Sequence, residues 1–396
     1  MQRINEFLCC VGLLATVGLP WQAQAYEPLV EKKIFTLPQF STAGGKSIKD
    51  VKVGWEAYGN LNADKSNVIL ICHYFSSNSH AAGKYAESDE RAGYWDSIIG
   101  SEKPIDTDKF YVISVDTLVN LGTGNPKVVT TGPATVNPDN GKPYGMSFPI
   151  VTIRDFVEIQ RQLLDSLGID NLHAVMGASM GALQAYEWAA AYPKRVNRVI
   201  PVIGSGWATG DVIAWLNIWS APIKLDPNWN GGDYYGGTPP IAGLATALKI
   251  VTLHAQNPEW SNGVFGRAWA KEGADPAKSF ANLFKIEAVL DGAGKARAKT
   301  SDANHFLYLA KANQLFYTGH AESLYEGLLA IDAPVLIIHT NEDLVFPGDD
   351  VRETAAIIKS DGTKVQVVEL QGTRGHLDGV LSIAQAGPSI RAFLSK

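Results

Sequence analysis

The sequence predicts an α/β fold in which helices flank a mostly parallel central sheet and a helical insertion covers one edge. Two observations lead to this class. Short, unbroken apolar runs alternate with helical patterns along most of the chain, and this alternation stops between about residues 206 and 324. Unbroken apolar runs are typical of strands buried on both faces, as in a parallel sheet between helix layers. The chain has 396 residues, more than the roughly 250–300 at which one compact core stops growing.

The predicted strands are short and rich in β-branched residues. One crossover helix is expected over residues 153–167, where apolar residues recur near the helical period. A second helix is expected from Met180 to about Ala191, directly after a strand. The predicted strands cover residues 51–58, 68–72, 110–115, 172–176, 198–203, 335–339 and 365–370.

The interruption at residues 206–324 separates two strands that should be neighbours in the sheet. It contains helical patterns, polar loops and several tryptophans, most of which are expected to pack inside it. Ligands of open α/β sheets bind beyond the carboxyl ends of the strands, so an insertion there would cover a substrate pocket. We therefore interpret residues 206–324 as a lid on a core formed by residues 26–205 and 325–396.

The first 25 residues have the pattern of a secretory signal peptide. Arg3 precedes an apolar run at residues 7–19, and the small-residue site Ala23-Gln24-Ala25 follows. The run is short for a membrane span, which needs about 20 apolar residues, so no stable membrane insertion is expected after cleavage. We expect export to the periplasm or the medium, with an uncleaved anchor or an internal helix as the alternatives. Cleavage would leave Cys72 as a lone cysteine, interpreted as a buried apolar residue.

Charge and metal-ligand spacing exclude several function classes. The net charge is −6 and no basic stripe appears, which argues against nucleic-acid binding. No Cys/His cluster has the spacing of a zinc site, so neither a metal nor another cofactor is expected. The expected partner is a small-molecule ester or acyl substrate.

The chemistry-bearing motif is Gly177-Ala178-Ser179-Met180-Gly181 between a predicted strand and a predicted helix. In this context G-x-S-x-G is the nucleophile elbow of an α/β-hydrolase fold, which exposes the serine hydroxyl at a sharp turn. The sequence therefore predicts Ser179 as a nucleophile. The backbone N–H of Met180 is the first candidate donor to an oxyanion.

A serine nucleophile needs a base and an acid, which follow it in this fold in the order serine, acid, histidine. Asp343 and His376 each lie just beyond a predicted strand end, on the edge that carries Ser179. Glu342 remains a rival acid. The second oxyanion donor is expected after an early strand, and the Phe75 N–H is the candidate.

Other histidines have plainer interpretations. His73 and His80 invite a catalytic or metal reading, but hydrogen bonds that shape their loop are favoured because a third ligand is lacking. His339 is expected to pack in the core. The bland interpretation of His254, His305 and His320 is a partly exposed polar contact, although each could line the pocket.

Ordered motifs along nearly the whole chain after residue 25 resemble the homoserine O-acetyltransferase family of the α/β-hydrolase superfamily. The resemblance implies that Ser179, Asp343 and His376 form the triad, and that dimers form through the lid. The matching motifs include Asn120-Leu121-Gly122, Thr131-Gly132-Pro133, Tyr144-Gly145-Met146-Ser147-Phe148-Pro149, Asp302-Ala303-Asn304, Asp343-Leu344-Val345-Phe346-Pro347 and Gly375-His376.

Four positions depart from that family pattern. Leu377 stands where members carry an acid after the histidine, and Thr300 replaces an Arg. A lid Arg corresponds to the stretch Ala247-Leu248-Lys249, and a lid Tyr corresponds to Leu253. In the family such groups are expected to hold the charged ends of homoserine. Apolar replacements favour an uncharged substrate, because a buried unpaired charge is costly.

These observations lead to three functional expectations. The first is a secreted serine hydrolase that cleaves a carboxylic ester, an amide or a lactone through an acyl-enzyme on Ser179, because an exported enzyme meets water rather than acyl-CoA. The second is an O-acyltransferase of the homoserine O-acetyltransferase type that uses acyl-CoA. The third is a non-catalytic binding protein on the same scaffold.

Overall fold

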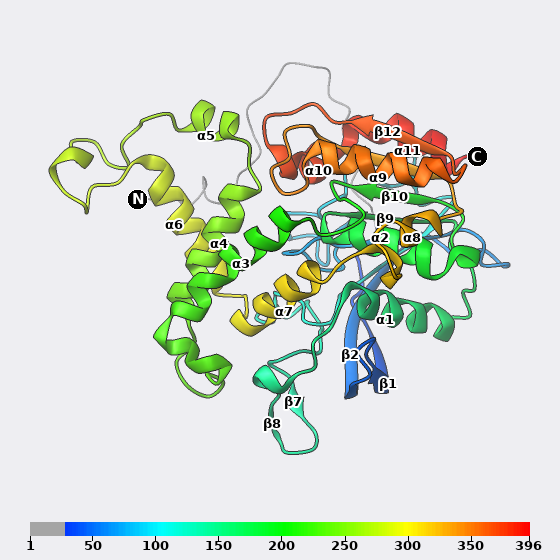
Figure 1. The fold of residues 1–396 in the computed structure, drawn as a ribbon, viewed down its shortest axis with the longest axis horizontal. Helices are drawn as coiled ribbons and strands as arrows, with labels where there is room; N and C mark the ends of the chain where they lie inside the picture. Colours follow the sequence, from blue (N-terminus) through cyan, green and yellow to red (C-terminus); the bar gives the residue numbers. More distant parts are fainter. Residues whose placement is uncertain (1–27) are drawn as a thin grey trace.

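A computed structural model describes residues 28–396 and confirms the predicted fold class (Figure 1). At its centre lies an eight-stranded sheet with the order β1-β2-β6-β3-β9-β10-β11-β12. Strands β6 to β12 of this order run parallel, whereas β2 pairs antiparallel with β1 and with β6. The strands are β1 Lys33–Ser41, β2 Ser47–Tyr58, β3 Val68–Cys72, β6 Tyr111–Val115, β9 Ala174–Ala178, β10 Val199–Val202, β11 Val335–His339 and β12 Val365–Glu369.

The predicted strands agree with the sheet to within a few residues, and two differences have a physical reason. The strand expected at 172–176 is β9, which starts two residues later because Leu172 makes only an isolated bridge to Val196. Strand β1 was not predicted, because it lies at the sheet edge and most of its side chains are at least partly exposed. Two short strand pairs lie outside the main sheet, β4 Ile99–Gly100 with β5 Ile105–Asp106 and β7 Val136–Asn137 with β8 Lys142–Pro143.

The central strands of the sheet are buried on both faces, and alternate residues of such a strand belong to different apolar clusters. In β3, Val68, Leu70 and Cys72 belong to one apolar cluster, while Ile69 and Ile71 belong to a second. The first cluster includes residues of α1, α2 and α9 and the second includes residues of α11, so helices cover both faces (Figure 1). These core helices are α1 Ile153–Ser166, α2 Met180–Ala191, α8 Glu326–Leu329, α9 Gly348–Ser360, α10 Asp378–Leu381 and α11 Gly387–Leu394.

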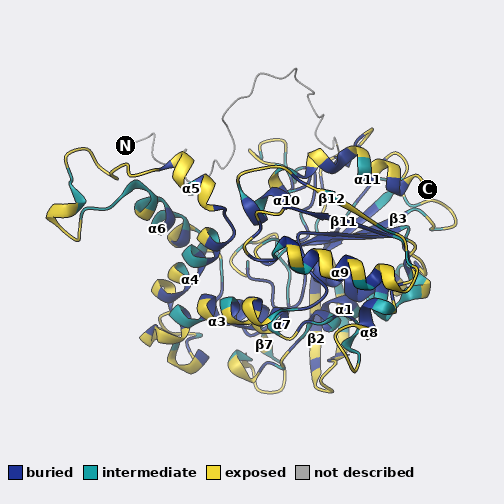
Figure 2. Ribbon diagram, turned by 45° about the horizontal axis from the view of Figure 1, so that its top comes forward, coloured by how far each residue is buried: buried dark blue, intermediate teal, exposed yellow. Residues whose placement is uncertain are grey.

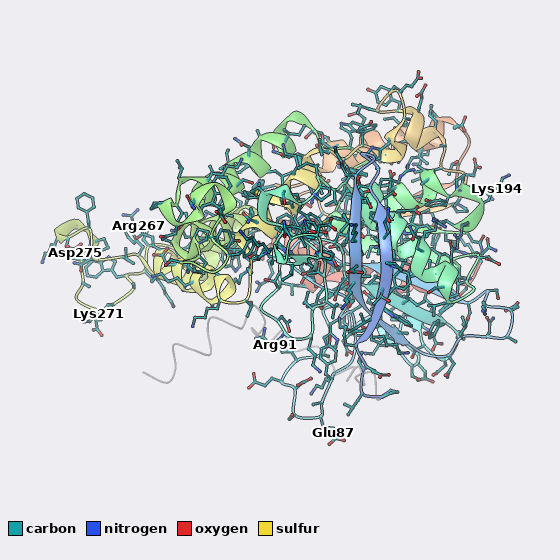
Figure 3. The ribbon with its side chains drawn as sticks, turned by 90° about the horizontal axis from the view of Figure 1, so that it is seen from below. Glu87, Arg91, Lys194, Arg267, Lys271 and Asp275 are labelled. Carbon is teal, nitrogen blue, oxygen red and sulfur yellow. The ribbon has the colours of Figure 1, made fainter. Side chains whose placement is uncertain are left out.

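Residues 206–324, here called the lid segment, lie between β10 and β11. Helices α3 to α6 extend to one side of the sheet (Figure 1) and keep exposed faces away from it (Figure 2). Arg267, Lys271 and Asp275 mark its far end (Figure 3). The helices of the lid segment are α3 Gly210–Leu225, α4 Ile241–His254, α5 Pro258–Val264, α6 Lys285–Ala298 and α7 Ala303–Gln314.

Short 3₁₀ helices connect several elements, and the one at Gly375–Leu377 carries the candidate base. Within residues 28–396 no helix is long and apolar enough to cross a bilayer. The predicted signal peptide lies outside the described residues. The other 3₁₀ turns are Gly145–Ser147, Pro193–Arg195, Pro227–Gly232, Pro276–Lys278, Thr318–His320 and Ile383–Ala386.

Candidate active site

Ser179 occupies the tight turn between β9 and α2, with φ 54° and ψ −120°. Residues other than glycine rarely adopt this backbone conformation, and here it projects the serine from the end of the sheet. The turn requires its two glycines. A Cβ at Gly181 would overlap the carbonyl oxygen of Cys72, and one at Gly177 would overlap the backbone of Gly181. The sequence G-x-S-x-G therefore follows from backbone packing as well as from chemistry.

His376 and Asp343 form a hydrogen-bonded chain with Ser179. The Ser179 Oγ lies 2.8 Å from His376 Nε2, and His376 Nδ1 lies 2.8 Å from Asp343 Oδ2. The Asp343 carboxylate only accepts, so Nδ1 carries the proton and Nε2 is free to accept the serine proton. All three residues are buried. The arrangement can deprotonate Ser179 and stabilise the imidazolium that forms.

The loop around Asp343 separates the two acids that the sequence left open. Backbone N–H groups of Val345 and Phe346 donate to Asp343 Oδ1, at 2.7 and 3.0 Å, and fix the carboxylate toward the histidine. Glu342 turns away, and its Oε2 accepts a hydrogen bond from Asn257 at 3.0 Å. Asp343 is therefore the acid that the structure places beside His376.

The two candidate oxyanion donors are both free. Among the described residues, neither the Phe75 N–H nor the Met180 N–H has a hydrogen-bond acceptor. Met180 is the first residue of α2, where the positive end of the helix dipole lies. This position favours binding of a negatively charged oxygen. Two unpaired N–H groups on the loops that flank Ser179 are what an oxyanion hole requires.

His73 and His80 shape the loop after β3 and do not join the chain at Ser179. His73 Nε2 accepts from the Thr117 N–H at 3.1 Å, so its Nδ1 carries a proton and donates to the Tyr74 carbonyl at 2.8 Å. Burial lowers the pKa of His73, which keeps it neutral. His80 Nδ1 lies 3.0 Å from Glu56 Oε2. Within residues 28–396 no group of three or more His, Cys, Asp or Glu side chains is placed to hold a metal ion.

The remaining candidates divide between core residues and one residue near the pocket. Cys72 is buried against Gln160 and its pKa is raised by burial, so it is inert as a nucleophile. His339 is buried in β11, as expected. The expected partial exposure was wrong for His254 and His305, which are buried. No sequence signal separates His254 from the others, because its burial depends on how α4 meets the catalytic loops.

A small cavity of about 30 Å³ lies beside Ser179. A larger groove of about 660 Å³ lies between α3 and α7, but it does not reach Ser179 or His376. We therefore take the small cavity as the site of the reacting group. It is lined by Phe75, Ser179, Val212, Trp215, Leu216, Trp219, His254, Asn313, Val345 and Phe346.

The end of α4 joins the lid segment to both catalytic loops. Residues 254–257 contact the acid loop through a histidine and an asparagine, and the histidine loop through a backbone carbonyl. The alignment of acid and base thus depends on the position of the lid segment. The contacts are His254 Nε2 to the Leu344 carbonyl at 3.0 Å, Asn257 Nδ2 to Glu342 Oε2 at 3.0 Å, and the Leu377 N–H to the Ala255 carbonyl at 3.3 Å.

The four departures from the family pattern lie outside the lining of the cavity. Lys249 pairs with Asp291 at 2.7 Å on the lid surface. Leu253 is 46% exposed, and Thr300 is exposed as well. Leu377 is half-buried against the lid segment. Apolar replacements at these positions therefore do not indicate an uncharged substrate.

Comparison with known proteins gives the same fold and a set of enzyme relatives. The family model of the alpha/beta hydrolase fold matches residues 100–377. A homoserine O-acetyltransferase of Methanohalobium evestigatum is 37% identical over 367 residues, which cover 92% of this chain and 73% of that protein.

Two crystal structures resemble the chain throughout. One is the homoserine O-acetyltransferase from Bacillus anthracis, with a TM-score of 0.89, 36% identity, and coverage of 93% of this chain and 98% of that chain. The other is esterase E22, with a TM-score of 0.89, 49% identity, and coverage of 92% and 100%. The two similar structures thus share one fold, and one is named an acetyltransferase and the other an esterase.

Proposed function

Because this chain belongs to the homoserine O-acetyltransferase family of α/β-hydrolase-fold enzymes, we propose that it is an O-acyltransferase of that type. It moves a short acyl group from an acyl-CoA thioester to the hydroxyl of a small alcohol. The observation that carries the proposal is the hydrogen-bonded chain from Ser179 through His376 to Asp343. The similarity to homoserine O-acetyltransferases over most of the chain supports transfer as the outcome.

In the proposed first half-reaction, Ser179 Oγ attacks the thioester carbonyl while His376 Nε2 takes the serine proton. The N–H groups of Met180 and Phe75 hold the oxyanion. The C–S bond breaks, and His376 returns the proton to the leaving thiolate. The products are acyl-Ser179 and free CoA.

The second half-reaction is the reverse with an alcohol in place of the thiol. His376 takes the hydroxyl proton, the alcohol oxygen attacks acyl-Ser179, and Ser179 leaves with the proton from His376. The new ester contains the acyl group and the alcohol oxygen. Asp343 orients the imidazole throughout both steps.

The cavity beside Ser179 favours a short acyl group. Its volume is about 30 Å³, little more than the space for one water molecule, which needs at least about 10–15 Å³. Aromatic and aliphatic side chains form most of its wall. An acetyl group is the acyl group that requires the least displacement of these side chains.

This proposal corrects the first expectation from sequence, the secreted serine hydrolase, which was wrong. The overturning finding is the identity to homoserine O-acetyltransferases over about nine-tenths of the chain. The apolar replacements that favoured hydrolysis do not line the cavity. The expected signal peptide lies outside the described residues and stays a prediction.

The direct test incubates the enzyme with acetyl-CoA and, in parallel, with homoserine or propane-1,3-diol, and measures the released thiol together with the O-acetyl ester. Equal amounts of both products, lost in Ser179→Ala, are the expected result. Thiol release with acetate as the only acyl product would contradict transfer. No turnover at all, with an intact fold, would contradict the catalytic role of the triad.

A further inference from the structure

His254, the last residue of α4, has one ring nitrogen in use and one without a partner. Its Nε2 lies 3.0 Å from the Leu344 carbonyl, and a carbonyl oxygen only accepts, so Nε2 carries the proton. Burial lowers the pKa of His254, so the ring is neutral and Nδ1 presents a lone pair. That Nδ1 is buried and has no hydrogen-bond partner among the described residues.

Trp219 supplies the complementary group from α3. Its Nε1–H is a donor that is also buried and without a partner in residues 28–396. The indole ring packs edge-on to His254, with ring centroids 5.6 Å apart. Trp215 stacks on the same imidazole at 4.0 Å and fixes its plane. One acceptor and one donor are thus held on neighbouring rings.

Both residues line the small cavity that contains Ser179. The other buried side-chain atoms without partners in the described part of the chain belong to residues outside this lining. A buried polar group left unpaired costs about 1–3 kcal/mol, so two in one small cavity indicate a bound group that pairs them. The wall contains no Lys, Arg, Asp or Glu that could neutralise a charge.

We propose that His254 and Trp219 form a subsite for a second, uncharged polar group of the acceptor alcohol. A hydroxyl fits both partners, because it donates to His254 Nδ1 and accepts from Trp219 Nε1. A carboxylate has no proton for Nδ1, and an ammonium group would be buried without a counter-charge. The inferred acceptor is therefore a short alcohol with a second hydroxyl or an amide. This inference rests on the proposed acyl transfer.

The test compares acceptors for one acyl-enzyme. p-Nitrophenyl acetate loads Ser179, and the released p-nitrophenolate counts acyl-enzyme formed. Propan-1-ol, propane-1,3-diol and homoserine then compete separately with water, and the yield of O-acetyl ester per p-nitrophenolate is measured. Per hydroxyl group, the diol is expected to be acetylated about threefold to tenfold more efficiently than propan-1-ol, which is the value of about one hydrogen bond.

Two variants separate the subsite from general packing. Trp219→Phe removes the Nε1–H and keeps an aromatic ring, and His254→Leu removes the Nδ1 lone pair together with the Nε2–H that donates to the Leu344 carbonyl. In both, the preference for the diol per hydroxyl group should fall toward one. The ester yield is divided by the p-nitrophenolate released, so a slower acylation does not change this ratio. Trp260→Phe is the matched control, because Trp260 is a buried lid tryptophan that packs on Phe265, away from the cavity lining. It should keep the preference of the parent enzyme.

The outcomes are distinguishable. Equal use of the diol and propan-1-ol, or a preference that survives both substitutions, would overturn the subsite and leave acyl transfer standing. Homoserine acetylated tenfold better than the diol would overturn the uncharged class. Acetate as the only product with every alcohol would overturn the proposed transfer and this inference with it.

Discussion

The imidazole of His73 holds the carbonyl oxygen of Tyr74 through a 2.8 Å hydrogen bond from Nδ1–H. That carbonyl and the Phe75 N–H belong to one trans peptide unit, so they point in opposite directions. Fixing the carbonyl thereby fixes the direction of the candidate oxyanion donor. His73 is itself held by the N–H of Thr117 at its other nitrogen.

Replacing His73 should therefore impair the chemical step more than binding. In His73→Leu, kcat is expected to fall by about tenfold to 10²-fold at nearly constant KM, less than the roughly 10²–10³-fold lost with an oxyanion donor. His73→Asn should recover part of the loss, because its amide can donate to the same carbonyl. Steady-state kinetics measure this. The control His173→Gln alters a similar ring-to-carbonyl contact, to Leu394, and should leave kcat unchanged.

The strained turn at Ser179 predicts opposite effects on activity and stability. Its φ of 54° is costly for any residue with a Cβ, by about 1–3 kcal/mol, and is readily adopted by glycine. Ser179→Ala and Ser179→Gly should both abolish labelling by a fluorophosphonate probe. Thermal unfolding should show Ser179→Gly to be more stable than Ser179→Ala, and equal midpoints would argue against strain at the turn.

The acid of the triad can be separated from its neighbour by a pair of isosteric changes. Asp343→Asn removes the charge that holds the His376 proton and should lower kcat by about 10⁴-fold, as expected for loss of this acid. Glu342→Gln changes an exposed side chain that accepts a hydrogen bond from Asn257, and kcat should change by less than about tenfold. Equal losses of kcat in the two variants would show that the loop conformation, and not the Asp343 charge, controls the rate.

The lowered pKa of Glu56 predicts that the folded state loses stability in acid. Burial would raise its pKa, but the hydrogen bond from His80 and the charge of Lys32 outweigh this and lower it from 4.5 to about 2. The stabilisation is present above pH 4.5 and is lost as the pH falls toward 2, and it amounts to about 3 kcal/mol. Urea unfolding between pH 6 and 3 should show this slope in the parent and a smaller one in Glu56→Gln. The exposed Glu87→Gln should behave like the parent.

The expected signal peptide at residues 1–25 predicts an exported protein whose first residue is Tyr26. Expression of the full chain, fractionation of the cells and N-terminal sequencing test this. Recovery in the cytoplasm with residues 1–25 attached would contradict export. The result also bears on the donor, since acyl-CoA is made in the cytoplasm and an exported enzyme would need another activated acyl ester.

Much of the fold and the triad geometry could be anticipated because both depend on local sequence. The elbow requires Gly177 and Gly181 wherever strand and helix meet this closely, so its motif is visible in the chain. Buried parallel strands such as β3 and β11 appear as apolar runs. Strand β1 has no such run, because only one of its nine residues is buried.

The pocket could not be derived in the same way. His254 and Trp219 come from different lid helices, and nothing in their local sequences shows that they meet beside Ser179. That Trp219 Nε1 and His254 Nδ1 lack hydrogen-bond partners among the described residues depends on the three-dimensional packing around them. The choice between Asp343 and Glu342 likewise needed the loop conformation, because adjacent residues share one position relative to the strand end.

The link between residues 254–257 and the two catalytic loops has a consequence for the order of events in a turnover. A cavity of about 30 Å³ must widen before an acyl donor can enter, and the lid segment that widens it also holds the loops of Asp343 and His376. We therefore expect the hydrogen bonds of Ser179, His376 and Asp343 to be best aligned when the lid segment is in the position seen here. We expect the choice between hydrolysis and transfer of acyl-Ser179 to depend on whether water or an alcohol occupies the cavity when the lid segment returns to this position.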